Sequence, residues 1–277
     1  MKGATHNTLL QYRKAAQFSE FTLKLLQIRA AETYARLVVP TAWYRRPGLP
    51  RDIVIRVSEK CFLHCKFCAQ GGEKGRVDQK NLSAPPIDTP TFRKIMDEAS
   101  GWRIKPFIKI TGGEPLVMGH TLLDALEEMR CRGFVVKLNT NGMLLKNKRI
   151  ARRIVDLDLN YLSISLDGGR EVHNELRGQP KLFDAIMEGI DNVREHRLTT
   201  GRKNPMILVS MCISSQTQDQ IEEVYRIACD KRIDWFNIQF LNYTTPQTCE
   251  DAHAYAREHL GVRETPWEAF CNPHFND

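Results

Sequence analysis

The stretch FIKITGGEP, residues Phe107–Pro115, joins a short apolar run to a turn with two glycines and a glutamate. The run has the composition of a buried β-strand, and the glycines allow the backbone to approach a neighbouring group closely. The glutamate then presents a carboxylate where the strand ends. A GGEP turn alone is more often a plain loop than a site, so its meaning depends on the sequence around it.

Five similar apolar runs lie on either side of this stretch, and helix-like segments separate them. The predicted strands are Ile53–Val57, Phe107–Thr111, Phe134–Asn139, Tyr161–Leu166, Met206–Ile213 and Trp235–Leu241. The predicted helices are Pro90–Ser100, Thr121–Arg132, Asn147–Asp156, Leu182–His196, Gln218–Lys231 and Cys249–His259. Because the apolar runs do not alternate cleanly with polar residues, we expect strands covered on both faces.

Six strand–helix units between Arg51 and Tyr243 average about 32 residues, close to the roughly 30 residues of a βαβ repeat. The strands should therefore be parallel, with right-handed crossovers. An open doubly wound sheet and a partial barrel both fit this pattern. We predict an α/β fold that is a partial (β/α)6, TIM-like barrel with an N-terminal helical leader. In either arrangement, chemistry belongs at the carboxyl ends of the strands.

Charge divides the chain unevenly. The 277 residues hold 40 Lys and Arg against 33 Asp and Glu, a net charge of +7, and the first 50 residues account for +6 of it. We predict a basic amphipathic leader with its linker over residues 1–50, a barrel over 51–245, and a C-terminal helix and tail over 246–277. No apolar run reaches the roughly 18–20 residues of a bilayer span, and no signal-peptide core is present, so we expect a cytoplasmic protein.

Two hypotheses remain for the leader. Its helices either pack on the barrel with a solvated basic face, or bind an acidic partner such as a membrane surface, nucleic acid or a peptide carrier. The barrel region has a charge of only +1 and lacks a basic stripe. We therefore expect no binding of bulk nucleic acid.

A cysteine loop, CFLHCKFC, follows the first predicted strand at Cys61–Cys68. Its C-x3-C-x2-C spacing brings three thiols together on one short loop. Thiolates are the ligands of iron–sulfur clusters, and three ligands on a four-iron cluster leave one iron open to a further molecule. A Cys3His zinc site that adds His64 is the alternative, although four ligands within eight residues are cramped for a tetrahedral structural site.

Three further segments follow later strands: NTNG at Asn139–Gly142, SISLDG at Ser163–Gly168 and HNELRG at His173–Gly178. With the cysteine loop and the GGEP turn, they resemble the radical S-adenosylmethionine (radical SAM) superfamily. The resemblance spans about Ile53–Tyr243. Together the motifs resemble the branch that contains the molybdenum-cofactor GTP cyclase, the pyrroloquinoline quinone maturase and the sulfatase-maturating enzymes.

The resemblance implies one oxygen-sensitive 4Fe-4S cluster on Cys61, Cys65 and Cys68, with SAM bound at the open iron. It implies SAM contacts from Phe67 (adenine), Gly112, Gly113 and Glu114 (methionine amino group), Ser165 and Arg177 (methionine carboxylate), and Asn139 and Asn141 (ribose). A carboxylate is the natural partner of an ammonium group, and a guanidinium binds a carboxylate in a bidentate manner. Competing structural roles are capping of strand ends by Ser165 and Asn139, a surface ion pair for Arg177, and a simple turn at Asp167–Gly168.

The activity implied by the resemblance is reductive cleavage of SAM to methionine and a 5'-deoxyadenosyl radical. The radical would abstract hydrogen from a peptide side chain or a small biosynthetic precursor, with flavodoxin or ferredoxin as the electron donor. A glycyl-radical activating enzyme is a further option, which the long leader disfavours. The alternative from another class is a non-catalytic zinc-loop binding module whose leader binds an acidic surface.

The remaining cysteines receive simpler interpretations. We expect Cys131, Cys212 and Cys229 to pack as small apolar residues. Cys249 and Cys271 are too few for a second cluster, so either the protein holds one cluster or the chain is cut short. Cys271 with His274 is only a weak signal for a metal or redox site.

Overall fold

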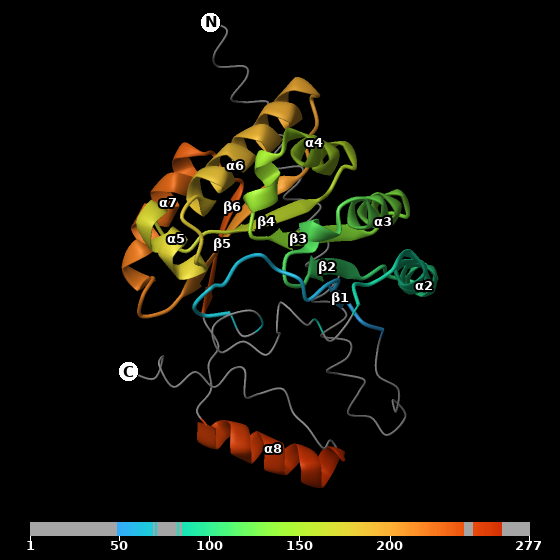
Figure 1. Cartoon of the computed structure of the whole chain (residues 1–277). Coiled ribbons are helices and arrows are strands. Elements are labelled where there is room, and N and C mark those ends of the chain that lie inside the picture. Colours follow the sequence, from blue (N-terminus) through green and yellow to red (C-terminus); the bar gives the residue numbers. More distant parts are fainter. Residues whose placement is uncertain (1–48, 69, 71–81, 83–84, 241–245, 262–277) are drawn as a thin grey trace, which may run out of the picture.

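The computed structural model describes residues 49–68, 70, 82, 85–240 and 246–261. Its centre is a six-stranded parallel sheet with the strands in chain order (Figure 1). The strands are β1 (Asp52–Arg56), β2 (Phe107–Thr111), β3 (Val135–Thr140), β4 (Tyr161–Ser165), β5 (Met206–Ile213) and β6 (Trp235–Phe240). Every predicted strand is therefore present within one residue at each end.

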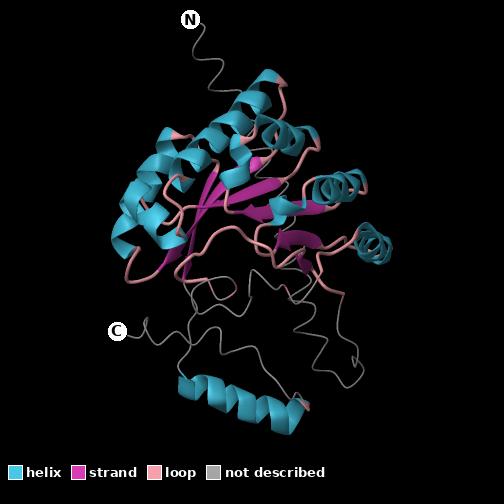
Figure 2. Cartoon of the chain, viewed as in Figure 1, coloured by secondary structure: helices cyan, strands magenta, loops and turns pink. Residues whose placement is uncertain are grey.

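Helices connect the strands, and one more helix follows β6. They are α2 (Thr89–Ser100), α3 (His120–Cys131), α4 (Lys148–Asp156), α5 (Arg170–Arg177), α6 (Leu182–Thr199), α7 (Ile221–Asp230) and α8 (Pro246–Leu260), with 3-10 turns η1 (Pro115–Met118), η2 (Met143–Lys146) and η3 (Gln218–Gln220). Figures 1 and 2 show α2 to α7 together on one side of the sheet. A doubly wound sheet would have helices on both faces and a reversal of strand order. The sequential order confirms the partial barrel instead.

The strands alternate in burial, which corrects the expectation that both faces would be equally covered. Ile108 and Ile110 of β2, and Val136 and Leu138 of β3, are completely buried. The residues between them are half-buried. Successive side chains of a strand point to opposite faces, so one face packs under the helices. The other, which we call the inner face, is the concave side of the partial barrel and is open to other groups.

Helix α5 is absent from the predicted elements. Its sequence, REVHNELR, buries only His173 and Leu176, so it shows little of the apolar periodicity that marks a helix. Gly178 ends the helix in the left-handed conformation, with a φ of 66°. This is a common helix C-terminus.

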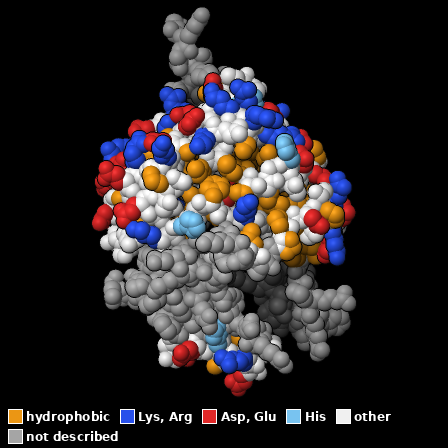
Figure 3. Space-filling view, in the orientation of Figure 1, with side chains coloured by type: hydrophobic (Ala, Val, Ile, Leu, Met, Phe, Trp, Pro, Cys, Tyr) orange, Lys and Arg blue, Asp and Glu red, His pale blue; other side chains and the backbone are white. Residues whose placement is uncertain are grey.

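Basic side chains gather over α4 on the outer surface (Figure 3). One of them, Arg153, pairs with Glu127 at 2.6 Å and with Asp124 at 3.3 Å. No helix in the described ranges is long and apolar enough to cross a membrane. Nearly all of the predicted leader, residues 1–48, and the tail from residue 262 onward, with Cys271 and His274, lie outside the described residues.

Candidate functional site

The cysteine loop begins directly after β1, at the carboxyl edge of the sheet. Cys65 is buried, whereas Cys61 and Cys68 are half-buried. Two of the sulfurs accept backbone hydrogen bonds: Leu63 N donates to Cys61 Sγ and Gln70 N donates to Cys68 Sγ, each at 3.4 Å. Such N–H donors stabilise sulfur that bears negative charge, which is the state of a metal-bound thiolate.

The protein environment favours the protonated thiol at Cys61 and at Cys65. Burial, together with the neighbouring Cys65, Glu114 and Cys68, raises the pKa of Cys61 to about 11, although the Leu63 hydrogen bond opposes this. Burial also raises the pKa of Cys65, against the charge of Arg177. Among the described residues, no three His, Cys, Asp or Glu side chains converge closely enough to hold one metal ion. In number and kind, the three sulfur donors nevertheless fit an iron–sulfur cluster with one open iron.

The GGEP turn holds one side of the cysteine loop through backbone contacts. Gly113 N donates to Ser58 O at 2.7 Å, and Glu114 N donates to Lys60 O at 2.8 Å. A Cβ at Gly113 would lie 2.5 Å from Glu59 O, well inside normal contact distance. The sequence suggested that the glycines admit a ligand; the structure shows that Gly113 admits the backbone leading into the cysteine loop.

Glu114 is completely buried, and both of its carboxylate oxygens are used inside the protein. Oε1 accepts from Thr140 Oγ1 at 2.7 Å and from Leu116 N at 3.1 Å, and Oε2 accepts from Asn141 N at 2.7 Å. Burial raises the pKa of Glu114, and the three hydrogen bonds oppose that rise. This carboxylate therefore joins the carboxyl ends of β2 and β3.

The end of α5 holds the opposite side of the cysteine loop. Lys66 N donates to Leu176 O at 2.8 Å, and Lys66 Nζ pairs with Glu175 at 2.6 Å. A Cβ at Gly178 would lie 3.0 Å from His64 O, so this glycine also permits close approach. The loop is thus fixed between the GGEP turn and a helix that the sequence did not reveal.

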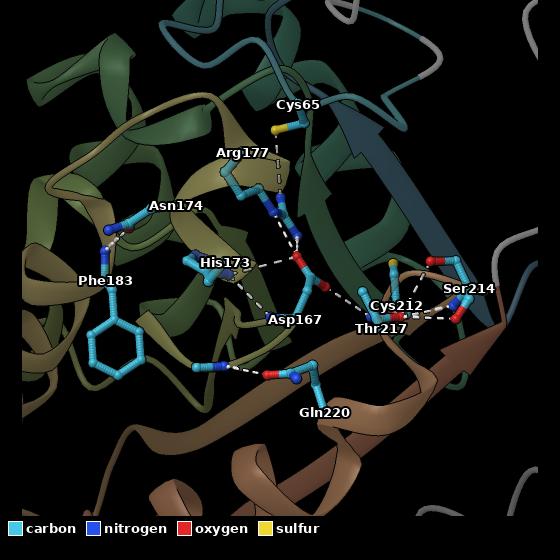
Figure 4. A network of polar contacts seen from close by, with 11 residues as sticks. Cys65, Asp167, His173, Asn174, Arg177, Phe183, Cys212, Ser214, Thr217 and Gln220 are labelled. Carbon is cyan, nitrogen blue, oxygen red and sulfur yellow. Dashed lines mark hydrogen bonds and ion pairs between the residues drawn. The ribbon is translucent and has the colours of Figure 1, made fainter. Parts of the chain in front are cut away.

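Arg177 lies beside the loop in a buried polar network (Figure 4). Its Nε and Nη2 donate to Asp167 Oδ2 at 2.7 and 2.6 Å, and its Nη1 lies 3.9 Å from Cys65 Sγ. The guanidinium carbon is 5.0 Å from the ring centroid of Phe67. The Arg177 side chain is only 11% exposed and that of Asp167 is fully buried, so the pair is not a surface ion pair.

Asp167 and His173 complete the network and were not predicted as site residues. Asp167 Oδ1 accepts from Cys212 N at 2.9 Å, and Asp167 N donates to His173 Nδ1 at 3.1 Å. Burial, together with Arg177, lowers the pKa of His173 to about 3, so the ring is neutral. Asp167–Gly168 is therefore more than a simple turn. The only sequence signal was an acid and a histidine within segments that resemble known motifs.

Two asparagines at the carboxyl end of β3 have polar atoms without a partner. Asn139 Oδ1 and Asn141 Nδ2 are buried and, within the described part of the chain, have no hydrogen-bond partner. Buried polar atoms are nearly always paired, so an unpaired pair at a strand end indicates a place for a ligand. Ser165 is half-buried at the end of β4 and pairs in register with Ser210 of β5.

The remaining cysteines differ from expectation. Cys131 and Cys229 are exposed at helix ends rather than packed in the core. Cys212 is half-buried on β5, and its proximity to Asp167 and Cys65 contributes to a raised pKa, although burial is the main cause. Cys212 therefore lies next to the site.

The fold and site together define an α/β partial-barrel protein whose three-cysteine loop lies among ligand-competent groups at the carboxyl edge of a parallel sheet. A family model described as the radical SAM superfamily matches residues 55–228. The chain belongs to that superfamily, whose members use a 4Fe-4S cluster and SAM.

Among known proteins, the chain is similar to Fe-coproporphyrin III synthase of Methanosarcina barkeri, with 26% identity over 149 residues, covering 54% of this chain and 35% of that protein. It is also similar to GTP 3',8-cyclase of Peptoclostridium acidaminophilum, with 28% identity over 196 residues, covering 69% and 55%. The chain thus spans about a third to about a half of the length of these relatives.

Among solved structures, Streptococcus suis SuiB bound to S-adenosylmethionine has a TM-score of 0.57 at 18% identity, covering 78% of this chain and 49% of that one. SuiB bound to its precursor peptide SuiA has a TM-score of 0.55 at 14% identity, covering 87% and 60%. At this level of identity, the likeness confirms the fold.

Proposed function

We propose that this protein binds one 4Fe-4S cluster through Cys61, Cys65 and Cys68 and uses SAM to abstract hydrogen from its substrate. When bound, the cluster supplies the electron that splits SAM into methionine and a 5'-deoxyadenosyl radical. The observation that supports this best is that three sulfur donors and the unpaired polar atoms of Asn139 and Asn141 lie at the same carboxyl edge of the sheet.

The chain's own groups would bind and orient SAM. The free Nδ2 of Asn141 and Oδ1 of Asn139 suit the donor and acceptor character of ribose hydroxyls. Ser165 offers a hydroxyl at the same edge, and Arg177 offers Nη1 beside Cys65 while Asp167 holds the rest of its guanidinium. Phe67 presents an aromatic ring that suits the adenine.

The GGEP turn would position the methionine end of SAM. The Glu114 carboxylate already accepts three hydrogen bonds, and a carboxylate has about four acceptor sites. Glu114 would therefore have about one acceptor site left for the methionine amino group. The other hydrogen-bond donors of the amino group would need the backbone carbonyls of Gly112 and Gly113. The backbone of these two glycines lies against the segment that enters the cysteine loop.

The proposed substrate is a peptide side chain or a small biosynthetic precursor. Support comes from the relatives, which include enzymes named for a tetrapyrrole product and for the nucleotide GTP, and from the fold neighbour SuiB, which binds a precursor peptide. We also propose flavodoxin or ferredoxin as the electron donor. Contact of the leader with a membrane surface remains our second hypothesis for residues 1–50.

Anaerobic reconstitution with iron and sulfide tests the proposal. We expect about four irons per chain, as one 4Fe-4S cluster requires, and release of 5'-deoxyadenosine when the protein is reduced with SAM. Cys65→Ala should lose the cluster, whereas Cys131→Ala, which removes an exposed thiol on α3, should keep it. Bound zinc without sulfide would support the binding-module alternative, and about eight irons would contradict a single cluster.

A further inference from the structure

Two lysines lie side by side on the inner face of the sheet. Lys109 of β2 and Lys137 of β3 are paired in the parallel register, so both side chains leave the same face of neighbouring strands, roughly 4.8 Å apart. Their sequence neighbours Ile108, Ile110 and Val136 are completely buried on the opposite face, under the helices. Both lysines therefore point into the concave side of the partial barrel.

Only one of the two ammonium groups is neutralised. Lys109 Nζ pairs with Asp52 Oδ1 at 2.9 Å and lies 5.5 Å from the ring centroid of Phe107. Lys137 is half-buried, and in the region that the structure describes no carboxylate lies within ion-pair distance of it. Burial, and secondarily the charge of Lys109, lowers the pKa of Lys137. Asp52 therefore balances the charge of Lys109, and the positive charge of Lys137 is left without a balancing carboxylate in the described region.

The lysines lie on the same face as the proposed SAM site. Asn139, with its unpaired Oδ1, is two residues beyond Lys137 on β3, which places it about 6.6 Å along the strand on the same side of the sheet. Tyr161 of β4 is the register partner of Lys137 on its other side. The ammonium group of Lys137 thus lies on the inner face, two residues closer to the amino end of β3 than Asn139.

This arrangement is costly unless a ligand completes it. Like charges directly opposite each other on neighbouring strands are destabilising, and a partly buried charge without a partner loses hydration. An oxyanion between the two ammonium groups would remove both costs. We propose that Lys109 and Lys137 form a binding site for a carboxylate or phosphate group of the substrate. This site lies on the inner face, closer to the amino ends of the strands than the proposed SAM site. The inference rests on the proposed function and narrows its substrate to an anionic molecule.

Thermal unfolding of the full chain, without reduction or turnover, tests the site. Inorganic phosphate and glutarate are the probes, with chloride used to keep the ionic strength constant. The wild type should gain thermal stability as either probe is added, by linkage to the folded state. The probe with the larger effect distinguishes phosphate from carboxylate recognition. Lys137→Met and Lys137→Gln should lose this response, and without a probe each should be at least as stable as the wild type.

Lys94→Met is the matched control, because Lys94 is an exposed lysine on α2, on the other side of the sheet. It should respond to the probes as the wild type does. The proposal is overturned if the wild type does not respond, if Lys94→Met and Lys137→Met lose the response equally, or if Lys137→Met lowers the melting temperature. Iron content and 5'-deoxyadenosine release test the proposed function separately, so the two can fail independently.

Discussion

Replacing Gly113 with alanine should detach the GGEP turn from the backbone that enters the cysteine loop. The new Cβ would lie 2.5 Å from Glu59 O and closer still to Lys60 O, and both of these are backbone atoms that no side-chain rotation can move away. Relief requires the segment at residues 58–60 to shift. That shift breaks the hydrogen bonds from Gly113 N to Ser58 O and from Glu114 N to Lys60 O.

The expected loss can be estimated from these contacts. Two hydrogen bonds contribute about 1 kcal/mol each, and overpacking of a tight contact costs about 1 to 3 kcal/mol. Gly113→Ala should therefore lower the free energy of unfolding by about 3 to 5 kcal/mol. Urea denaturation measures this value, and the reconstituted variant should also retain less iron because the loop that bears the cysteines has moved.

Gly101→Ala is the control for the loss of a glycine as such. Gly101 has a φ of −76°, and a Cβ there would lie 3.6 Å from Glu98 O, an ordinary contact. Its free energy of unfolding should stay within about 0.5 kcal/mol of the wild type or rise by up to about 1 kcal/mol. If Gly113→Ala lowered the free energy of unfolding by less than about 1 kcal/mol and left the iron content unchanged, the close backbone contact would not be the reason that position 113 needs glycine.

Two further predictions concern the buried network. Burial, and secondarily Arg177, lowers the pKa of His173 from 6.5 to about 3, so the unfolded chain binds a proton here that the folded chain does not. This contribution to stability is full above pH 6.5 and falls as the pH drops toward 3, by up to about 1.4 kcal/mol per pH unit. In His173→Gln, the free energy of unfolding should therefore fall less steeply between pH 6.5 and pH 3 than in the wild type. An unchanged slope would count against a neutral His173. Arg177→Met leaves Asp167 buried without its cation and should cost about 3 to 5 kcal/mol in urea denaturation. The double variant with Asp167→Asn should recover much of this, whereas additive losses would contradict the pairing.

Much of the fold follows from the sequence because each strand is an apolar run with clear ends. Phe107–Thr111 and Met206–Ile213 have the predicted limits, since a proline precedes each strand and a glycine or a serine follows it. Helix α5 could not be found in this way, because eight mostly polar residues form it and its contacts are with the distant cysteine loop. The alternation of burial was also hidden, because inner-face positions such as Phe107 and Val135 are apolar although only half-buried.

The site was predictable in its residue types but less so in its contacts. The sequence indicated that cysteines, glycines and Glu114 belong together. It could not show that Glu114 accepts hydrogen bonds from Thr140 and Asn141, because these residues lie 26 and 27 positions after Glu114 in the sequence. The same holds for Arg177 and Cys65, 112 residues apart. Such roles depend on which side chains the packed fold leaves unpaired, and local patterns do not contain that information.

The groups that hold the cysteine loop in place differ from the groups that could bind a metal or SAM. Backbone hydrogen bonds from Gly113, Glu114 and Lys66 fix its position, and none of them uses a thiol. The environment raises the pKa of Cys61 and Cys65, so these sulfurs are thiols until a metal displaces their protons. Because these backbone contacts hold the loop in place, the sulfurs could bind metal without breaking them. The unpaired atoms of Asn139 and Asn141, at the same carboxyl edge of the sheet, offer a position for a second ligand.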